Sequence, residues 1–217
     1  WAERALELHE NEIHHLLADL PLPLYLTTNV DNFMFEALCH RGRAARRAGP
    51  RWEPQAGSPQ YVLTPRPTAD QPVVFHINGH DGDDEQRRHL VLSEDDYLAH
   101  LIRLSRDQET ILPMNLLSEI SQHSFVFLGY SLHDWEFRVI LHGLLKPIAS
   151  TGGAKLHVGV QLDVEQNPNA DRVVDYLRRY LGRFNIEIYW GTPQQFVGEL
   201  HAYWQEYLEV ADDGWGF

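Results

Sequence analysis

Cysteine is nearly absent from this sequence of 217 residues, in which Cys39 is the only one. A single thiol excludes an internal disulfide, and it excludes every zinc module that is built from several cysteines. By default it also favours the reducing environment of the cytoplasm. We therefore expect a cytoplasmic protein whose fold lacks a zinc ribbon.

Basic residues are also scarce, with 18 Lys and Arg against 31 Asp and Glu, which gives a formal net charge of −13. This balance argues against broad binding to nucleic acid, which depends on neutralising phosphates with Lys and Arg. Apolar runs are short as well, since none reaches the roughly 18 uninterrupted residues that a membrane span requires. We expect no direct nucleic-acid binding and no association with a membrane.

An initiator Met is missing too. The first residues, WAERALELHENEIHHLL, follow an amphipathic helical pattern with neither a basic start nor an apolar signal core. We therefore expect this chain to be part of something longer.

Short apolar runs alternate with helical patterns along the chain. The runs of strand length lie at 24–28, 72–78, 124–129, 155–162 and 186–190. Apolar strands separated by helices favour a doubly wound α/β fold, which is a mostly parallel sheet with helices on both faces. We expect one such domain over residues 1–217, in which the Arg-, Pro- and Gly-rich stretch 41–71 is a long loop excursion.

A basic stretch interrupts the acidic background within this excursion. It contains Arg41, Arg43, Arg46, Arg47 and Arg51. Runs of like charge are commonly solvated loops or helix ends. The same arginines would also suit a dock for an acidic partner or for phosphates, so both interpretations stay open.

Polar clusters follow three of the predicted strands: TTNVD at 27–31, HINGHD at 76–81 and GYSLHD at 129–134. Ligands of open α/β sheets bind at the carboxyl ends of the strands, so the three clusters could line one cleft. Asn29 can donate and accept hydrogen bonds at once, and Asp31 can cap a helix while presenting a carboxylate. A plain turn-and-cap role for both residues remains the alternative.

The third cluster has features that suit a nucleotide. Gly129 follows a strand and permits close approach of a ligand, while Ser131 at a helix start suits a phosphate or a ribose hydroxyl. Asp134 and Arg138 lie one helical turn apart, and we interpret them as an ion pair that fixes this helix start.

Thirteen histidines raise the question of a metal site. His14 and His15 are adjacent in a helical pattern and cannot face one ion, and no Cys or carboxylate spacing completes a set around His76 and His80. Nucleophilic catalysis is equally unsupported, because Ser131 lacks the G-x-S-x-G elbow and the single cysteine is expected to pack inside an apolar helix. We expect no metal.

Two longer motifs indicate the family to which these clusters belong. They are LVLSEDDY at 90–97 and GYSLHDWEFR at 129–138. Together with TTNVD and the strand that ends before Gly79, they resemble the sirtuin family. They are most similar to the sirtuin-like domains of bacterial NAD-consuming antiphage defence proteins. The pattern there runs T-T-N-Y-D, H-G, L-V-L-T-E-D-D-Y and G-Y-S-L-x-D-x-x-x-R. The resemblance covers about residues 20–205.

That resemblance implies a Rossmann-like domain acting as an NADase, a hydrolase that converts NAD, its substrate, to nicotinamide and ADP-ribose without a metal. It implies catalytic roles for Asn29, Asp31 and Asn78. It implies that NAD contacts Thr27, Thr28, Asn29, Asp31, Gly79, Gly129, Tyr130 and Ser131. The chemistry is reasonable, because an oxocarbenium-like ribose needs polar groups that hold its hydroxyls and position a water molecule.

The resemblance also implies a biological setting. Such a domain would be an effector of antiviral defence that acts by abortive infection. A sensor or regulatory protein or domain would hold it inactive until infection, and we expect it to form a homo-oligomer.

Two departures from the family pattern bear on activity. The Gly-Ala-Gly-x-Ser loop that cradles the NAD phosphates does not occur, so we expect it, with the first strand, upstream of Trp1. Asn78 stands where the family has its catalytic His, and Asn cannot take up a proton near neutral pH. Loss of a general base typically costs about 10² to 10⁴ in rate. We therefore expect this chain to bind NAD better than it cleaves it. His76 lies on the same strand face as Asn78 and is the one neighbour that could replace the missing His as general base.

Two other functions stay open. A non-catalytic module would bind NAD or ADP-ribose, or would use the fold for assembly. A lysine deacylase is the weaker alternative, because such sirtuins usually carry a four-cysteine zinc module.

Overall fold

The computed structural model describes residues 12–51, 61–82, 87, 90–107, 111–130, 135–142, 155–161 and 170–213. The chain divides into two compact units. Unit 1 comprises residues 1–49, 67–88 and 193–217, and unit 2 comprises residues 50–66 and 89–192. Each unit contains a three-stranded sheet whose paired strands are all parallel. The predicted α/β class with parallel strands and helices is confirmed.

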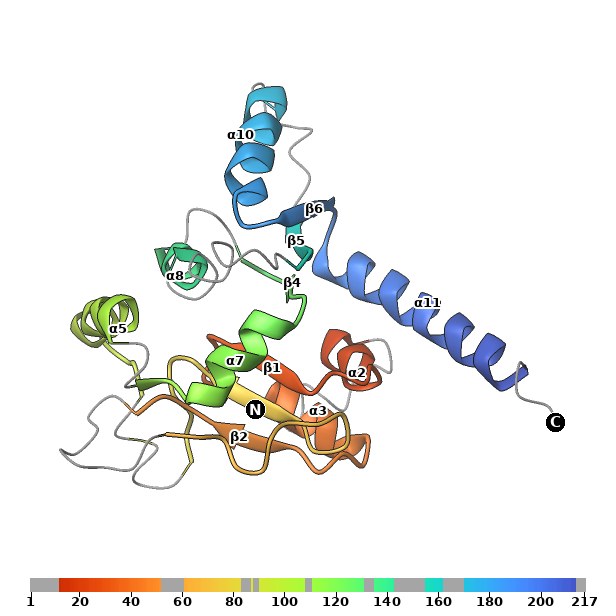
Figure 1. Ribbon diagram of the computed structural model, residues 1–217, viewed down its shortest axis with the longest axis horizontal. Helices are drawn as coiled ribbons and strands as arrows, with labels where there is room; N and C mark the ends of the chain where they lie inside the picture. Colours follow the sequence, from red (N-terminus) through yellow and green to blue (C-terminus); the bar gives the residue numbers. More distant parts are fainter. Residues whose placement is uncertain are drawn as a thin grey trace. The chain divides into compact units, whose positions relative to one another are not determined.

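Unit 1 is built around β3 (Val73–His76), the central strand in the order β1-β3-β2. All four of its residues are buried, as is typical of a strand inside a parallel sheet. The flanking strands are β1 (Leu24–Thr27) and β2 (Arg46–Ala48). The described helices of this unit include α2 (Ile13–Ala18), α3 (Phe33–His40) and α11 (Pro193–Asp213), the long blue helix of Figure 1.

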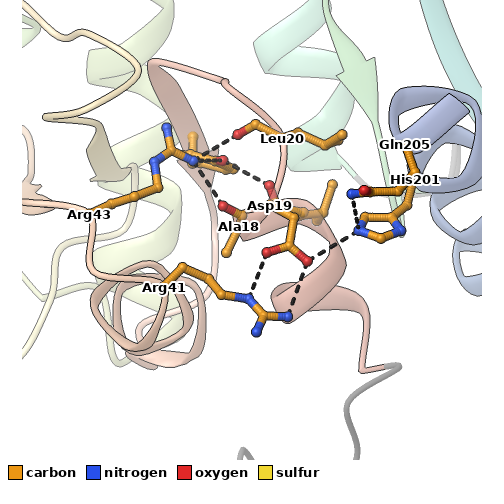
Figure 2. A network of polar contacts seen from close by, with 9 residues as sticks. Ala18, Asp19, Leu20, Arg41, Arg43, His201 and Gln205 are labelled. Atoms are coloured by element: carbon orange, nitrogen blue, oxygen red, sulfur yellow. Dashed lines mark hydrogen bonds and ion pairs between the residues drawn. The ribbon is translucent and has the colours of Figure 1, made fainter. Parts of the chain in front are cut away.

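Arg43 ties the segment before β1 to the loop before β3. Its guanidinium donates hydrogen bonds to the Tyr25 hydroxyl, at 3.1 Å, and to four backbone carbonyls. The carbonyls belong to Ala18, Leu20, Leu22 and Ala69. Five donors in a fixed planar fork make arginine suited to such a junction. Figure 2 shows this side chain with its contacts to the carbonyls of Ala18 and Leu20.

Asp19, at the end of α2, joins two further segments of unit 1 (Figure 2). Its carboxylate lies 2.7 Å from Arg41 Nε and 3.1 Å from His201 Nε2 of α11. Arg41 and Arg43 therefore have partners inside the chain, which favours a structural interpretation for this part of the basic stretch. The predicted loop excursion also contains a strand, β2, that sequence reasoning missed.

Unit 2 has the strand order β4-β5-β6, with β5 (His157–Gln161) at the centre. Its edge strands are β4 (Val126–Phe127) and β6 (Ile186–Trp190). Among the residues that the structure describes, its helices include α5 (Glu94–Arg106), α7 (Met114–Gln122), α8 (Trp135–Ile140) and α10 (Ala170–Gly182). The core is apolar and partly aromatic, and it includes Phe127, Phe137, Leu141, Val160, Leu181 and Ile186.

The start of α5 is fixed by reciprocal capping contacts. The Ser93 hydroxyl accepts a hydrogen bond from the Asp96 N–H, and the Asp96 carboxylate accepts one from the Ser93 N–H. This reciprocal arrangement satisfies two backbone donors at a helix start. The capping lies within LVLSEDDY, so part of that motif is explained by helix formation alone.

The last half of α11 carries large side chains that are exposed to solvent. Tyr203 is 70% exposed and Val210 is 68% exposed. Although α11 has 21 residues, neither it nor any other helix within the described ranges is apolar enough over a sufficient length to cross a bilayer.

Candidate functional site in unit 1

The first predicted cluster, Thr27–Asp31, forms the turn that leads from β1 into α3. The Asn29 N–H donates to Thr27 Oγ1 at 3.0 Å, and the Phe33 N–H donates to Asp31 Oδ1 at 3.1 Å. Asp31 therefore accepts a hydrogen bond from the first residue of α3, whereas the N-cap position is Asn32, which makes no side-chain capping bond. Asn29 is exposed, which leaves its side chain accessible to a ligand.

The second cluster, His76–Asp81, continues the pairing between β1 and β3 beyond the strands themselves. Three successive carbonyls of the first cluster each accept one hydrogen bond from the end of β3. The Thr27 carbonyl accepts from the Ile77 N–H at 2.8 Å. The Thr28 carbonyl accepts from Asn78 Nδ2 at 2.8 Å, and the Asn29 carbonyl lies 3.0 Å from His76 Nδ1.

This arrangement brings the two predicted clusters of unit 1 together. We call the two side-chain contacts, His76 to Asn29 and Asn78 to Thr28, the carbonyl clamp. It fixes the backbone that presents the Asn29 side chain. The turn after it is completed by Gly79, whose φ of 81° lies in the left-handed region that favours glycine. The Gly79 N–H donates to the His76 carbonyl at 3.1 Å.

Burial changes the protonation of the histidine in the clamp. His76 is 1% exposed, and its ring centroid lies 5.2 Å from that of His80, which is 5% exposed. Loss of solvent lowers the pKa of His76 below its usual value, and the nearby Arg47 charge lowers it further. The contact with Asn29 and the carboxylates of Asp31 and Asp81 oppose this shift only in part. His76 is therefore neutral at neutral pH.

A cation lies beside the clamp. Arg47 of β2 donates to Asn32 Oδ1 at 2.6 Å and to Asp81 Oδ1 at 2.9 Å, and Asn32 Nδ2 lies 3.3 Å from the same Asp81 oxygen. Desolvation, which would raise the pKa of Asp81, is outweighed by the hydrogen bonds from Asn32 and Arg47 and by the Arg47 charge, so this pKa is lowered. The carboxylate is thus held in its ionised form. One further arginine of the basic stretch is therefore paired within unit 1.

The third predicted cluster belongs to unit 2 and is described only in part. Gly129 has a φ of 74°, which favours glycine. The ring of Tyr130 stacks on Phe137 with 5.0 Å between centroids, and the Tyr130 carbonyl accepts a hydrogen bond from Gln161 Nε2 at 3.1 Å. Ser131 and Asp134 lie outside the described residues, so the predicted phosphate contact and the Asp134–Arg138 pair stay predictions.

Two other predictions concern metal and thiol chemistry. Within the described residues, no group of three or more His, Cys, Asp or Glu side chains is arranged to hold a metal ion. The expectation that Cys39 packs inside its helix is wrong, because the residue is exposed at the end of α3. Partial burial, together with the charge of Glu36, raises its thiol pKa, and a raised pKa makes the thiol a poor nucleophile.

Comparison with known proteins identifies the family. The sequence model of the SIR2-like domain matches residues 23–181. The chain belongs to the SIR2-like domain family. The NAD(+) hydrolase ThsA of Cytobacillus dafuensis is similar as well, with 27% identity over 135 residues. Those residues make up 62% of this chain but only 24% of that protein, so this SIR2-like chain matches about a quarter of its relative.

The match to the SIR2-like domain covers both predicted clusters of unit 1 and the Gly129–Tyr130 turn of unit 2. Sequence reasoning did not find the carbonyl clamp or the Arg47 contacts. HINGHD showed that polar residues end a strand, but no sequence signal reveals which backbone carbonyl each side chain meets. Arg47 was visible only as one arginine in a run.

Proposed function

We propose that this SIR2-like domain binds NAD at the carboxyl end of the unit 1 sheet and cleaves the bond between nicotinamide and ribose. The observation that carries the proposal is the carbonyl clamp, which holds the exposed Asn29 and the neighbouring Asp31 beside Asn78 and Gly79. This lies within the stretch that matches the SIR2-like domain. The name of the relative as an NAD(+) hydrolase supports the same reaction.

Hydrolysis of NAD breaks the C1′–N bond, and nicotinamide leaves with the bonding electrons. Water then adds to C1′ and loses a proton, so that ADP-ribose and nicotinamide are the products. Asn29 would hold a ribose hydroxyl, because its amide can donate and accept. Asp31 would stabilise the positive charge that develops on the ribose.

NAD binding would extend along the remaining predicted residues. Thr27, Thr28 and Gly79 surround the clamp, and we assign them to the ribose. The sequence resemblance also implies NAD contacts for Gly129, Tyr130 and Ser131 of unit 2, and these stay predictions. A backbone without a Cβ at Gly129 would allow close approach of a phosphate or a ribose.

Asn78 would make this domain a slow hydrolase. Its amide nitrogen already donates to the Thr28 carbonyl, and an amide cannot accept a proton near neutral pH. The missing general base would cost about 10² to 10⁴ in rate. NAD would therefore stay bound for longer than it would in a relative with His at this position.

The setting proposed for this activity is bacterial antiphage defence by abortive infection. In that setting a sensor or regulatory protein or domain would keep the effector inactive, and the protein would act as a homo-oligomer in the cytoplasm. Depletion of NAD would then halt the infected cell. Binding and cleavage of NAD by the purified protein do not depend on this setting.

The proposal is tested with the full-length protein by measuring NAD binding calorimetrically and nicotinamide release chromatographically. The unaltered protein is expected to bind NAD and to release nicotinamide and ADP-ribose slowly, in equal amounts. Asn29→Ala is expected to reduce release at least about tenfold, since one hydrogen bond to a charged or developing centre contributes about 1.5 to 3 kcal/mol. Gln71→Ala, an exposed change in the loop before β3, is the control and should leave release unchanged. Absence of both binding and release would refute the proposal.

A non-catalytic role is the second candidate, and the contact of Asn78 with Thr28 favours it. In that case the clamp would shape a pocket for NAD or ADP-ribose without chemistry. Calorimetry would then show tight binding of either ligand, and nicotinamide would not be released even during long incubation.

A further inference from the structure

One ring nitrogen at the end of β3 has no hydrogen-bond partner within the described residues. His76 is 1% exposed, and its Nε2 atom is enclosed while it makes no hydrogen bond. Buried polar atoms are nearly always paired, and an orphan costs free energy unless something else binds it. The atom therefore marks a position where a ligand or a water molecule would be held.

The clamp decides what kind of atom Nε2 is. A carbonyl oxygen can only accept a hydrogen bond, so His76 Nδ1, 3.0 Å from the Asn29 carbonyl, must carry the proton. In a neutral imidazole the other nitrogen then has a lone pair. Nε2 is consequently an acceptor and a base, and no group in the described part of the chain donates to it.

Among the described residues, the charged and titratable groups around this ring come from three segments of unit 1. They are Arg47 of β2, Asp31 before α3, and His80 and Asp81 after β3. Arg47 and Asp81 form an ion pair. The negative charge of Asp81 near the ring is therefore balanced by the positive charge of Arg47. Burial is the largest influence on the ring and keeps its pKa below that of an ordinary histidine.

We propose that His76 Nε2 is the proton acceptor of this site, in the role that Asn78 cannot fill. The inference rests on the proposed NAD hydrolysis. Once nicotinamide has left with the C1′–N electrons, water forms its bond to ribose C1′ and one water proton passes to Nε2. His76 then returns the proton to solvent. A water molecule bound at Nε2 would satisfy the orphan acceptor before the reaction.

The test uses a substitution that separates the two nitrogens of the ring. In His76→Asn, the Asn amide nitrogen occupies the position of Nδ1 and can keep the bond to the Asn29 carbonyl. The change therefore removes the base and preserves the clamp. Nicotinamide release by the full-length protein is measured across pH for the unaltered protein and for His76→Asn.

The proposal predicts that His76→Asn lowers kcat at least about 10²-fold while the KM for NAD changes little. In the unaltered protein, kcat should fall on acidification below pH 6.5, as His76 becomes protonated. That acid limb should be missing from any residual activity of His76→Asn. A purely structural histidine would not produce this split between kcat and KM or remove the acid limb.

The control is the same change in an Asn78→His background. A histidine at 78 would supply its own base, so adding His76→Asn there should lower kcat by less than about threefold. This result would show that His76→Asn leaves the site intact, and it is the coupling that a double-mutant cycle measures.

Failure of this inference and failure of the proposed function give different results. If the unaltered protein releases nicotinamide and His76→Asn matches it at every pH, the inference is wrong and NAD hydrolysis stands. If Asn78→His releases nicotinamide and the unaltered protein does not, the inference about His76 is also wrong, but the fold can still hydrolyse NAD. If neither the unaltered protein nor Asn78→His releases nicotinamide, NAD hydrolysis itself is wrong, and the role of His76 fails with it.

Discussion

His76 and His157 both lie on the central strand of their unit and both bond through Nδ1, yet this nitrogen donates in one and accepts in the other. Each is a buried histidine on the central strand of a three-stranded parallel sheet, and burial lowers the pKa of both. His157 Nδ1 accepts a hydrogen bond from the Phe125 N–H at 3.0 Å, so its proton is on Nε2. In His76 the proton is on Nδ1, because the partner is a carbonyl.

The difference shows how one residue type can serve structure in one unit and chemistry in the other. The lone pair of His157 is used by the backbone that enters β4, at the amino end of β5. Its ring also packs among the aromatic rings of Phe125 and Phe127. The lone pair of His76 is enclosed without a partner in the described residues at the carboxyl end of β3, which is the end where parallel sheets bind ligands.

The largest expected effect comes from restoring a histidine beside the unit 1 clamp. In Asn78→His, ring Nδ1 would replace the Asn78 amide at the Thr28 carbonyl and Nε2 would be free to accept a proton. We expect nicotinamide release by the full-length protein to rise by up to about 10²-fold, because His76 already supplies part of the 10² to 10⁴ that a general base contributes. Asn78→Ala, which removes the contact and supplies no base, should give no increase. Equal rates in Asn78→His and the unaltered protein would contradict this assignment.

The next effect is a loss of stability at acid pH, because burial lowers the pKa of histidines in both units. Burial lowers the pKa of His100 on α5 to about 4, whereas the unfolded chain has an ordinary value near 6.5. Between these values the unfolded chain binds more protons, so the free energy of unfolding falls as the pH falls. His100 alone would account for a loss of about 3 kcal/mol between pH 6.5 and 4.

Urea unfolding at a series of pH values measures this loss. His100→Leu should flatten the acid slope, because it removes one proton that only the unfolded chain binds in this range. His40→Leu, at the exposed end of α3, serves as the control. An unchanged slope in His100→Leu would show that this histidine is not buried in its neutral form.

The opposite roles of Nδ1 in His76 and His157 could not have been predicted from the sequence. Apolar runs and helical periodicity predicted the parallel α/β architecture, because each strand and helix is set by nearby residues. The polar ends of β1 and β3 were also predicted, and the motifs pointed to the family. The contact of Asn78 with the Thr28 carbonyl spans 50 residues, and such long-range pairing depends on strand register, which composition does not reveal.

Other features of the structure could not be predicted from the sequence, also for physical reasons. The strand β2 has three residues, all arginine or alanine, so it shows no apolar run. Arg43 was seen as one charge in a basic stretch, whereas its role depends on four carbonyls that come together only in the fold. The orphan nitrogen of His76 is likewise a property of packing and not of residue type.

A smaller effect tests the structural role of the unit 2 histidine. His157→Phe keeps an aromatic ring of similar size but leaves the Phe125 N–H without its acceptor. We expect the free energy of unfolding to fall by about 1 to 3 kcal/mol, measured by urea unfolding. Nicotinamide release at saturating NAD should be unchanged. A loss of release without a loss of stability would mean that His157 and His76 had been assigned the wrong way round.

The smallest effect tests how closely the strands of unit 2 pack. A Cβ on Gly159 of β5 would lie 3.1 Å from Ile186 Cγ2, so Gly159→Ala should destabilise the protein by about 1 kcal/mol. Gly182→Ala is the matched control, because a Cβ there meets no atom within 4 Å. That substitution should stabilise the protein slightly, by about 0.4 to 1 kcal/mol, since alanine restricts the unfolded chain. Thermal unfolding distinguishes the two signs.

The central claim is that His76 holds an unprotonated Nε2 at the carboxyl end of β3, whereas His157 holds an unprotonated Nδ1. Long-range proton–nitrogen correlation spectra of the histidine rings, recorded at pH 7.5 and assigned with His76→Asn and His157→Phe, measure this directly. We predict a pyridine-like Nε2 and a pyrrole-like Nδ1 for His76, and the reverse for His157. A charged His76 ring, or one with its proton on Nε2, would contradict the claim.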